Sequence, residues 1–356
     1  MSFLLAFLGF ALLIILHELG HFFAAKAVGM RVERFSLFFP PLLARHKRGE
    51  TEYAIGAIPL GGYVKITGMN PAEEIPPEHA HRAYYRQPVW KRIVVIAAGP
   101  AVNIVLAFGI LWVLLWANGV GEGTGRVERV TAEPAVGALR AGDQIVSVDG
   151  VRGSFERLRE QISTHRCAGE PEDGCRAATP ATIVVTNDGE QRTLRLAPVY
   201  SEAEDDMFIG FQTGTRVRPI GPGEAADESI YQMWFFTSKT VETIAGIFEA
   251  DKREDISGVV GGYEVTRQTI ELSAERAVYL LAIISLSLGI INLFPFLPLD
   301  GGHIFWAVAE KLRGRAIPFS VMERAGFVGF VLVIALFMIG LTNDVGRLTG
   351  EGFGVR

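Results

Sequence analysis

Two histidines and a glutamate near the N-terminus have the residue types and the spacing needed for metal-dependent hydrolysis. They stand in the run Leu16-His17-Glu18-Leu19-Gly20-His21, an H-E-x-x-H motif at the end of an apolar stretch. Residues four apart lie on one face of a helix, so His17 and His21 can bind one metal ion together. Zinc held by three protein ligands keeps one position open and lowers the pKa of water there to about 7. Glu18 is offset from the histidine pair, so it can reach the metal-bound water. The alternative interpretation of the motif is a helix end that carries two ordinary histidines.

The motif belongs to one of four segments that are apolar and close to the roughly 20 residues that a membrane-spanning helix needs. We expect these spans at residues 1–28, 93–117, 277–299 and 325–342, with a C-terminal tail at 343–356. The mean hydropathy is +0.28, and a soluble protein of this size rarely carries several such uncharged runs. This favours a polytopic α-helical membrane protein with four spans over a soluble enzyme with buried core helices. Ionisable groups inside a span are costly, so a functional role is the first interpretation of the motif. The net charge of −5 argues against nucleic acid as a partner.

Lys and Arg residues between the spans predict the orientation of the chain. Eleven of them lie within residues 26–92 and four within residues 300–324, whereas none precedes Lys26. Because cytoplasmic connections are enriched in Lys and Arg, we expect the 29–92 and 300–324 loops in the cytoplasm. Both termini and the long 118–276 segment are then extracytoplasmic. The missing positive n-region also argues against a cleaved signal peptide.

A third metal ligand is expected where the third span ends. Pro295 and Pro298 break the helix there, and irregular backbone at that depth must line protein or a water-filled cavity. Asp300 is the carboxylate of this segment, and the orientation places it on the same side of the membrane as the H-E-x-x-H motif. Asp300 is therefore the preferred third ligand. His303 is the alternative ligand, and a helix-capping role for Asp300 is the other interpretation.

The first loop contains a candidate β-element. Short β-like runs at 53–55 and 63–66 flank Pro59-Leu60-Gly61-Gly62, and the Gly-Gly pair predicts the turn of a membrane-associated β-hairpin. A β-element beside a catalytic cleft could receive an extended peptide by strand addition. The alternative is a structural loop that dips into the membrane.

The 118–220 segment predicts an inserted α+β domain. We expect strands at 126–130, 144–148, 181–186, 191–196 and 207–211, a helix at 155–163, and a short helix and turn at 134–143. This pattern, its size and the run Pro134–Gly150 resemble a PDZ domain, a type of domain that binds peptides at an exposed strand edge. A purely steric role is the alternative. Residues 221–276 are expected to form an amphipathic linker that lies on the outer membrane surface or packs on this domain.

The chain has two cysteines, Cys167 and Cys175, and both fall in the segment expected outside the cytoplasm. In an oxidising compartment they can form a disulfide that closes a short loop. Two free thiols are the alternative.

Three motifs together resemble those of the bacterial site-2 proteases. They are H-E-L-G-H at 17–21, G-x-x-P-L-G-G-Y-V-K at 56–65, and N-L-x-P with L-D-G-G at 292–302. The resemblance covers nearly the whole chain and includes a PDZ-like domain between the second and third spans. Two departures stand out: Pro298 comes one position later than in the family's P-x-P, and Ile256–Gly261 lacks the proline of the family's S-G-P-V-G.

The resemblance implies an intramembrane zinc metalloprotease of the branch that cleaves anti-sigma factors. It implies that His17, His21 and Asp300 bind Zn²⁺ and that Glu18 is the catalytic base. The protein is then expected in the bacterial inner membrane, with its active site near the cytoplasmic side.

The substrate implied by the resemblance is a single-span membrane protein of the anti-sigma factor class. Asn292 is expected to hold its backbone, and Gly61 and Gly62 in the expected hairpin are placed to hold the unwound strand. Two other functions are considered. One is a non-catalytic membrane scaffold that binds peptides through its PDZ domain; the other is a metal transporter, against which the single ligand cluster and the missing inverted repeat argue.

Overall fold

The computed structural model describes residues 2–58, 61–70, 73–202, 206–246, 258–315 and 317–350. The chain divides into two compact units. One comprises Met1–Leu114 and Pro222–Arg356, and the other comprises Leu115–Gly221.

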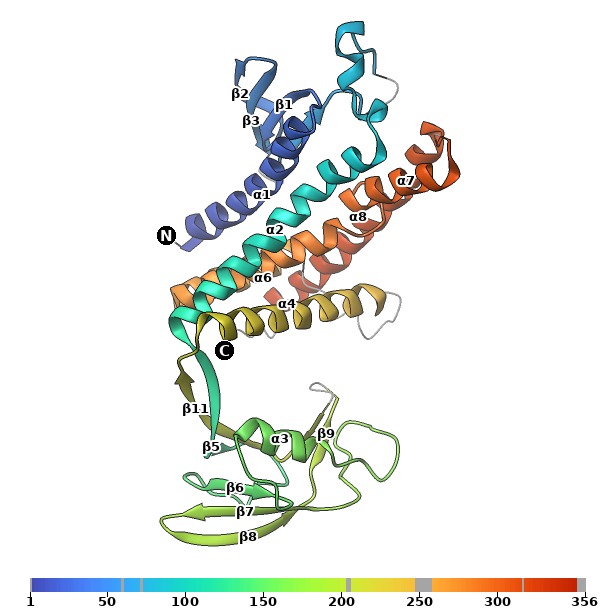
Figure 1. Cartoon of the computed structure of the whole chain (residues 1–356). Helices are drawn as coiled ribbons and strands as arrows, with labels where there is room; N and C mark the ends of the chain where they lie inside the picture. The colour runs from blue at the N-terminus through green and yellow to red at the C-terminus, as the bar shows by residue number, and fades with distance from the viewer. Residues whose placement is uncertain are drawn as a thin grey trace. The chain divides into compact units, whose positions relative to one another are not determined.

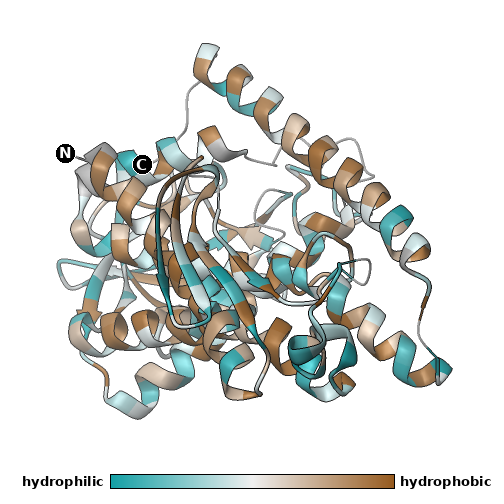
Figure 2. Cartoon of the chain, turned by 90° about the horizontal axis from the view of Figure 1, so that it is seen from above, coloured by the Kyte–Doolittle hydropathy of each residue, from teal (hydrophilic) through white to brown (hydrophobic). Residues whose placement is uncertain are grey.

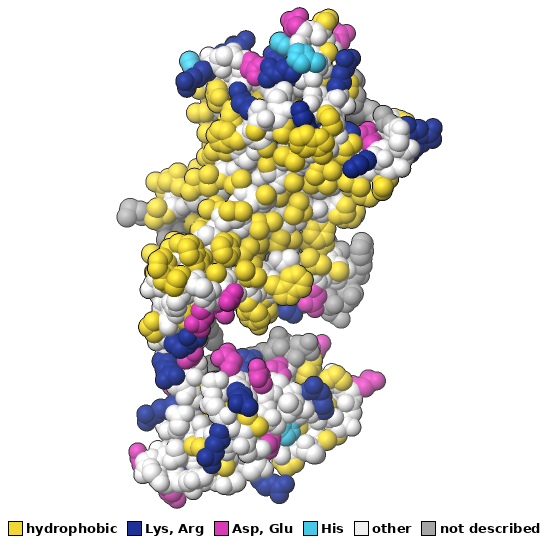
Figure 3. All heavy atoms as spheres, in the orientation of Figure 1, with side chains coloured by type: hydrophobic (Ala, Val, Ile, Leu, Met, Phe, Trp, Pro, Cys, Tyr) yellow, Lys and Arg dark blue, Asp and Glu magenta, His cyan; other side chains and the backbone are white. Residues whose placement is uncertain are grey.

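Four helices in the described residues are long and apolar enough to cross a membrane (Figures 1 and 2). They are α1 (Ser2–Ala27), α2 (Val89–Asn118), α6 (Ala274–Asn292) and α8 (Phe319–Thr349). Only 11–33% of the most apolar window of each helix is buried within the chain, so most of each apolar surface faces outward, as contact with lipid requires. On the face shown in Figure 3, hydrophobic side chains form a broad band across the first unit. The prediction of a four-helix membrane protein is confirmed.

Three further helices pack among these four. They are α4 (Pro222–Ala245), α5 (Val259–Leu272) and α7 (Asp300–Arg313). Met233 and Phe236 of α4 pack on apolar residues of α2 and α6, whereas Ile230 and Trp234 of the same helix remain largely exposed. The N-terminus of α5 is held by buried Asp344 of α8, whose carboxylate accepts hydrogen bonds from the N–H groups of Gly258 and Gly261 (3.0 and 2.7 Å). Residues 256 and 257 of the noted Ile256–Gly261 segment lie outside the described residues.

A four-stranded sheet follows α1. Its strands are β1 (Val32–Leu37), β2 (Phe39–Arg48), β3 (Thr51–Ile58) and β4 (Tyr63–Ile66), in the order β2-β3-β1-β4. Short 3₁₀ helices η1 (Pro77–Arg82) and η2 (Tyr84–Arg86) lead from the sheet to α2. Val32 and Phe35 of β1 are buried in a core with Phe22 of α1, which fixes the sheet against that helix.

The expected hairpin over residues 53–66 is wrong. β1 lies between β3 and β4, and pairs parallel with β3 and antiparallel with β4. The hairpin of this sheet is β2–β3, which pair antiparallel from Phe39↔Ile58 to Arg48↔Thr51. The physical reason is burial: β1 carries the apolar residues that pack on α1, so it takes the central position, and a local turn signal does not report this competition.

The second unit has a five-stranded sheet in the order β11-β5-β6-β7-β8. Its elements are β5 (Val120–Val130), β6 (Gln144–Val148), α3 (Phe155–Ser163), β7 (Ala181–Asn187), β8 (Glu190–Leu196) and β11 (Phe211–Arg218), with a separate pair β9 (Val199–Ser201) and β10 (Asp206–Phe208). Leu158 and Ile162 of α3 pack into the core formed by the inward residues of the sheet, including Val127, Ile183 and Val185. The helix and four of the expected strands are present.

Two local expectations in this unit are wrong. Residues 134–143 form turns without a helix, because Gly137 and Gly142 take positive φ angles of 76° and 93°. The expected strand at 207–211 is divided into β10 and β11 by Gly210, which has a φ of 85°.

Asp143 ties the end of these turns to the sheet. Its buried carboxylate accepts hydrogen bonds from the N–H of Arg140 and from the side chains of Asn187 and Arg192. Burial by itself would raise the pKa of Asp143, but these donors and the charge of Arg192 outweigh burial and hold the pKa below its usual value. The ion pair therefore stabilises the charged form of Asp143.

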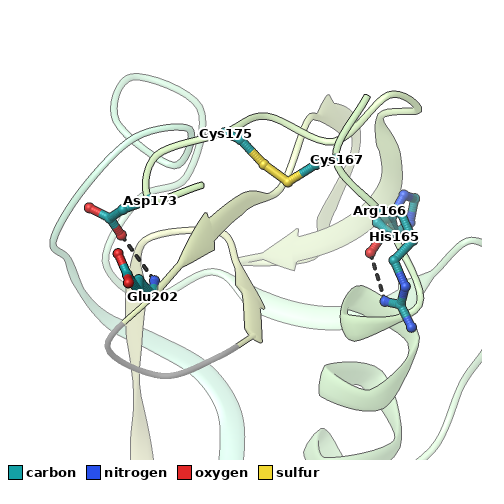
Figure 4. Close-up of a disulfide and its surroundings, with 6 residues drawn as sticks. All are labelled: His165, Arg166, Cys167, Asp173, Cys175 and Glu202. Carbon is teal, nitrogen blue, oxygen red and sulfur yellow. Dashed lines mark hydrogen bonds between the residues drawn. A yellow bond between two sulfur atoms is a disulfide. The ribbon is translucent and has the colours of Figure 1, made fainter. Parts of the chain in front are cut away.

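Cys167 and Cys175 form a disulfide in the connection between α3 and β7 (Figure 4). This settles the alternative between a bridge and two free thiols. The backbone on both sides of the bridge is also tied: the N–H of Ala178 donates to the carbonyl of Arg166, and the N–H of Tyr200 donates to the carbonyl of Cys175, both at 2.9 Å. The loop is thus fastened by a covalent bond and by hydrogen bonds.

Candidate active site

Three side chains that could bind a metal converge where α1 meets the start of α7. His17 and His21 are one helical turn apart on α1, both are buried, and their Nε2 atoms are 3.2 Å apart. Asp300, the first residue of α7, brings its Oδ2 atom to 3.2 Å from each Nε2 atom. Among the described residues, this is the one group of three or more His, Cys, Asp or Glu side chains close enough to hold an ion.

The dimensions of this group fit a zinc ion. Bonds of about 2.0–2.1 Å in a tetrahedron separate ligand atoms by about 3.3 Å, which matches the three distances of 3.2 Å. Asp300 Oδ2 is buried and has no hydrogen-bond partner of good geometry in the described part of the chain. A cation at the centre would satisfy this oxygen, and two nitrogens with one carboxylate oxygen are a ligand set that zinc uses.

Asp300 reaches the site because the chain between α6 and α7 folds tightly. α6 ends at Asn292, and the irregular backbone of residues 293–299 leads directly into α7. A Cβ atom at Gly301 would lie 2.1 Å from the backbone oxygen of Leu293, so only glycine permits this close approach. The two prolines expected to interrupt the helix thus lie in the turn that delivers Asp300.

A single stripe of α2 supports the two histidine rings. Val95, Gly99 and Asn103 follow one another at intervals of four residues. The carbonyl oxygen of Val95 is 2.8 Å from His21 Nδ1, and the side-chain amide of Asn103 is 3.3 Å from His17 Nδ1. A carbonyl can only accept, so His21 carries its proton on Nδ1, which leaves Nε2 free to bind a metal.

Glu18 lies beside this group and faces a cavity of about 390 Å³. Its carboxylate has no ion-pair or hydrogen-bond partner within the described residues, so it is available to exchange a proton with a molecule in the cavity. A Cβ atom at Gly62 would lie 2.9 Å from Glu18 Cγ, which shows how closely the segment before β4 approaches this side chain.

The other expected site residues lie around the same cavity. Gly61, Gly62 and Asn292 line it together with Tyr63 and Val64 of β4. The Asn292 amide nitrogen donates to the carbonyl of Leu288 at 3.0 Å, which leaves its side-chain oxygen without a donor of its own chain in the described residues. The Gly-Gly pair thus reaches the cavity although the expected hairpin is wrong.

His303, the alternative ligand, does not belong to the three-residue group. It lies on α7 almost one turn beyond Asp300. The sequence prediction did not include the contacts of α2 with the two histidines. One residue indicated them: Asn103 lies in the middle of an apolar span, where an asparagine needs a polar partner from the protein.

Comparison with known proteins adds the following. The sequence profile of peptidase family M50 matches residues 5–336. A Rhizobium meliloti protein named as a zinc metalloprotease is 29% identical over 365 residues, which cover 95% of both chains. The zinc metalloprotease Rip1 of Mycobacterium bovis is 30% identical over 390 residues, which cover 93% of both chains.

Proposed function

The chain belongs to peptidase family M50, the site-2 proteases, and is a zinc metalloprotease of the membrane; we propose that it cleaves a peptide bond within the transmembrane segment of its substrate. One observation carries this proposal: the candidate zinc ligands and Glu18 lie on or at the end of helices apolar enough to span a bilayer. His17, Glu18 and His21 belong to α1, and Asp300 follows the end of α6. A peptide bond reaches such a site from within the membrane.

The chemistry divides between the metal and the chain. His17, His21 and Asp300 would hold the zinc ion, which would lower the pKa of a water molecule and polarise a substrate carbonyl. Glu18 takes a proton from the attacking water and donates it to the leaving amine. Its unpaired carboxylate and its position at the cavity support this role.

The substrate must present an extended segment, because a helix keeps its carbonyl groups in hydrogen bonds. β4 is an edge strand of its sheet and lines the cavity, so its free edge can pair with an extended substrate. Gly62 keeps a side chain away from Glu18, and Gly61 lines the same cavity beside the ring of Phe39. Asn292, which lines the same cavity, offers its side-chain oxygen to a substrate N–H.

Residues 118–220 are proposed as an extracytoplasmic PDZ domain, with both termini on the same side of the membrane. The order β11-β5-β6-β7-β8 with the packed helix α3 supports a PDZ-like fold, and the disulfide supports an oxidising compartment. The domain would exclude substrates whose outer part is still intact. A single-span membrane protein of the anti-sigma factor class is the proposed substrate.

The test is cleavage of a model transmembrane substrate in detergent by wild type and Glu18→Gln, with the zinc content of both measured. Glu18→Gln is expected to keep its zinc and to lose cleavage by a factor of at least about 10²–10⁴. Glu264→Gln is the matched control, because Glu264 lies on α5 and pairs with Arg267 away from the cavity. Cleavage by Glu18→Gln at the wild-type rate would overturn the role of Glu18 as the base, and no cleavage by a zinc-loaded wild type would favour the scaffold function.

A further inference from the structure

Asn103 is a fully buried polar residue in the middle of an apolar helix, and the mechanism above does not use it. Its amide nitrogen is 3.3 Å from His17 Nδ1, while its amide oxygen is buried without any hydrogen-bond partner among the described residues. A buried oxygen without a donor costs about 1–3 kcal/mol, so this arrangement needs an explanation.

The explanation follows from the proton on His17. When Nε2 of a neutral imidazole binds a metal, the proton lies on Nδ1, and Nδ1 then needs an acceptor. An amide NH₂ group cannot accept that proton. A half-turn of the carboxamide exchanges two ends of almost equal shape and brings the oxygen to the place now held by the nitrogen. The oxygen then lies about 3.3 Å from Nδ1 and accepts its proton, while the NH₂ group takes the buried place that the oxygen leaves.

We propose that Asn103 is a positioning residue for the zinc site, with its side-chain carbonyl accepting Nδ1–H of His17 and thereby aiming Nε2 at the metal. The inference rests on the proposed zinc site and assigns it a residue outside the H-E-x-x-H and L-D-G-G motifs. Val95 does the same for His21 through its backbone carbonyl at 2.8 Å. The two rings are thus oriented by acceptors two turns apart on one face of α2.

At the level of Asn103, the backbone of α2 contacts α6. The hydroxyl of Ser285, also fully buried, donates to the backbone carbonyl of Asn103 at 3.0 Å. A Cβ atom at Gly289 would lie 3.0 Å from the backbone oxygen of Pro100 and 3.4 Å from Asn103 Cβ, so α6 approaches α2 closely at this level. Ser285→Ala is therefore a matched control, because it removes a hydrogen bond between α6 and α2 and leaves the contact of the Asn103 side chain with His17 unchanged.

The test compares zinc affinity of the full-length protein in detergent, measured by competition with a chelator, for wild type, Asn103→Leu, Asn103→Asp and Ser285→Ala. Loss of the acceptor in Asn103→Leu is expected to weaken zinc binding about 10–100-fold. Asn103→Asp keeps an acceptor oxygen and is expected to remain within about threefold of wild type, as in a carboxylate–histidine–zinc triad. Ser285→Ala removes a buried hydrogen bond from the same helix pair and is expected to keep the wild-type affinity.

A second readout is the absorption spectrum of the Co²⁺-substituted protein, which reports the ligand geometry and does not depend on activity. Asn103→Leu is expected to change this spectrum, whereas Asn103→Asp and Ser285→Ala leave it unchanged. Wild-type affinity and spectrum in Asn103→Leu overturn the inference while the zinc site stands. An equal loss in Asn103→Asp, or in Ser285→Ala, overturns it as well, because packing would then explain the effect. If Asn103→Leu does not fold, the Asn103→Asp comparison decides. A wild-type chain that binds no zinc overturns this inference and the proposed function together.

Discussion

Substitution of Gly99 by alanine tests the geometry of the site with a single methyl group. Gly99 lies on α2 opposite the two histidines, and a Cβ atom there would be 2.3 Å from His21 Nε2 and 2.9 Å from His17 Nε2. Non-bonded heavy atoms need about 3.5 Å. The methyl group and the histidine rings therefore have to move apart by about 1 Å. The clash involves two of the three candidate ligand atoms.

The two histidine rings cannot move by this distance without weakening zinc binding. His21 is tied to the carbonyl of Val95 at 2.8 Å, and zinc–ligand distances tolerate only about 0.2 Å. A displacement of about 1 Å at a catalytic site costs on the order of 10²-fold in rate. We expect Gly99→Ala to lose zinc affinity by at least about 10–100-fold and cleavage by about 10²-fold or more.

The assay is zinc content and chelator competition on the purified full-length protein, together with cleavage of the model substrate. Gly109→Ala is the matched control on the same helix, because a Cβ atom there meets nothing within 4 Å. This control is expected to behave as wild type in both assays. Wild-type zinc affinity and cleavage in Gly99→Ala would refute the assignment of His17 and His21 as ligands in this geometry.

Two further predictions concern the 115–221 unit and are measured by hydrogen exchange in the full-length protein. The pKa of Asp143 is lower in the folded state than in the unfolded chain, where it is about 4. Its ion pair with Arg192 therefore stabilises the unit fully at pH values above about 4. This stabilisation is lost as the pH falls from there through the folded-state pKa. Asp143→Asn is thus expected to cost about 3 kcal/mol at pH 7 and progressively less in acid; a cost independent of pH would contradict the pairing. Cys167 and Cys175 are eight residues apart, and replacing both by serine releases this loop in the unfolded chain. The gain in unfolded-state entropy is expected to lower the stability of the unit by about 2–3 kcal/mol. A loss of stability below about 0.5 kcal/mol would disprove this.

Local features of the fold were predictable where one segment determines its own state. Three of the four spans follow from long uncharged apolar runs, because a segment that exposes no charge over about 20 residues has few environments besides a bilayer. The helix α3 (Phe155–Ser163) and the strands β6 to β8 likewise follow from their own periodicity. The hairpin at 53–66 failed because β1 competes for the same position through burial against α1.

For the site, the sequence by itself determined the pairing of His17 with His21, since a spacing of four residues fixes their common face on any helix. It also singled out Asp300 as the carboxylate at the end of an interrupted span. Only the tertiary structure decided that Asp300 Oδ2 lies 3.2 Å from both histidines, because this distance depends on how α1 and α7 meet across 279 residues of chain. It alone also placed Gly99 and Asn103 of α2 against the histidine rings. The spacing of ligands along one helix is set by covalent geometry, whereas the contacts of that helix with its neighbours are set by packing.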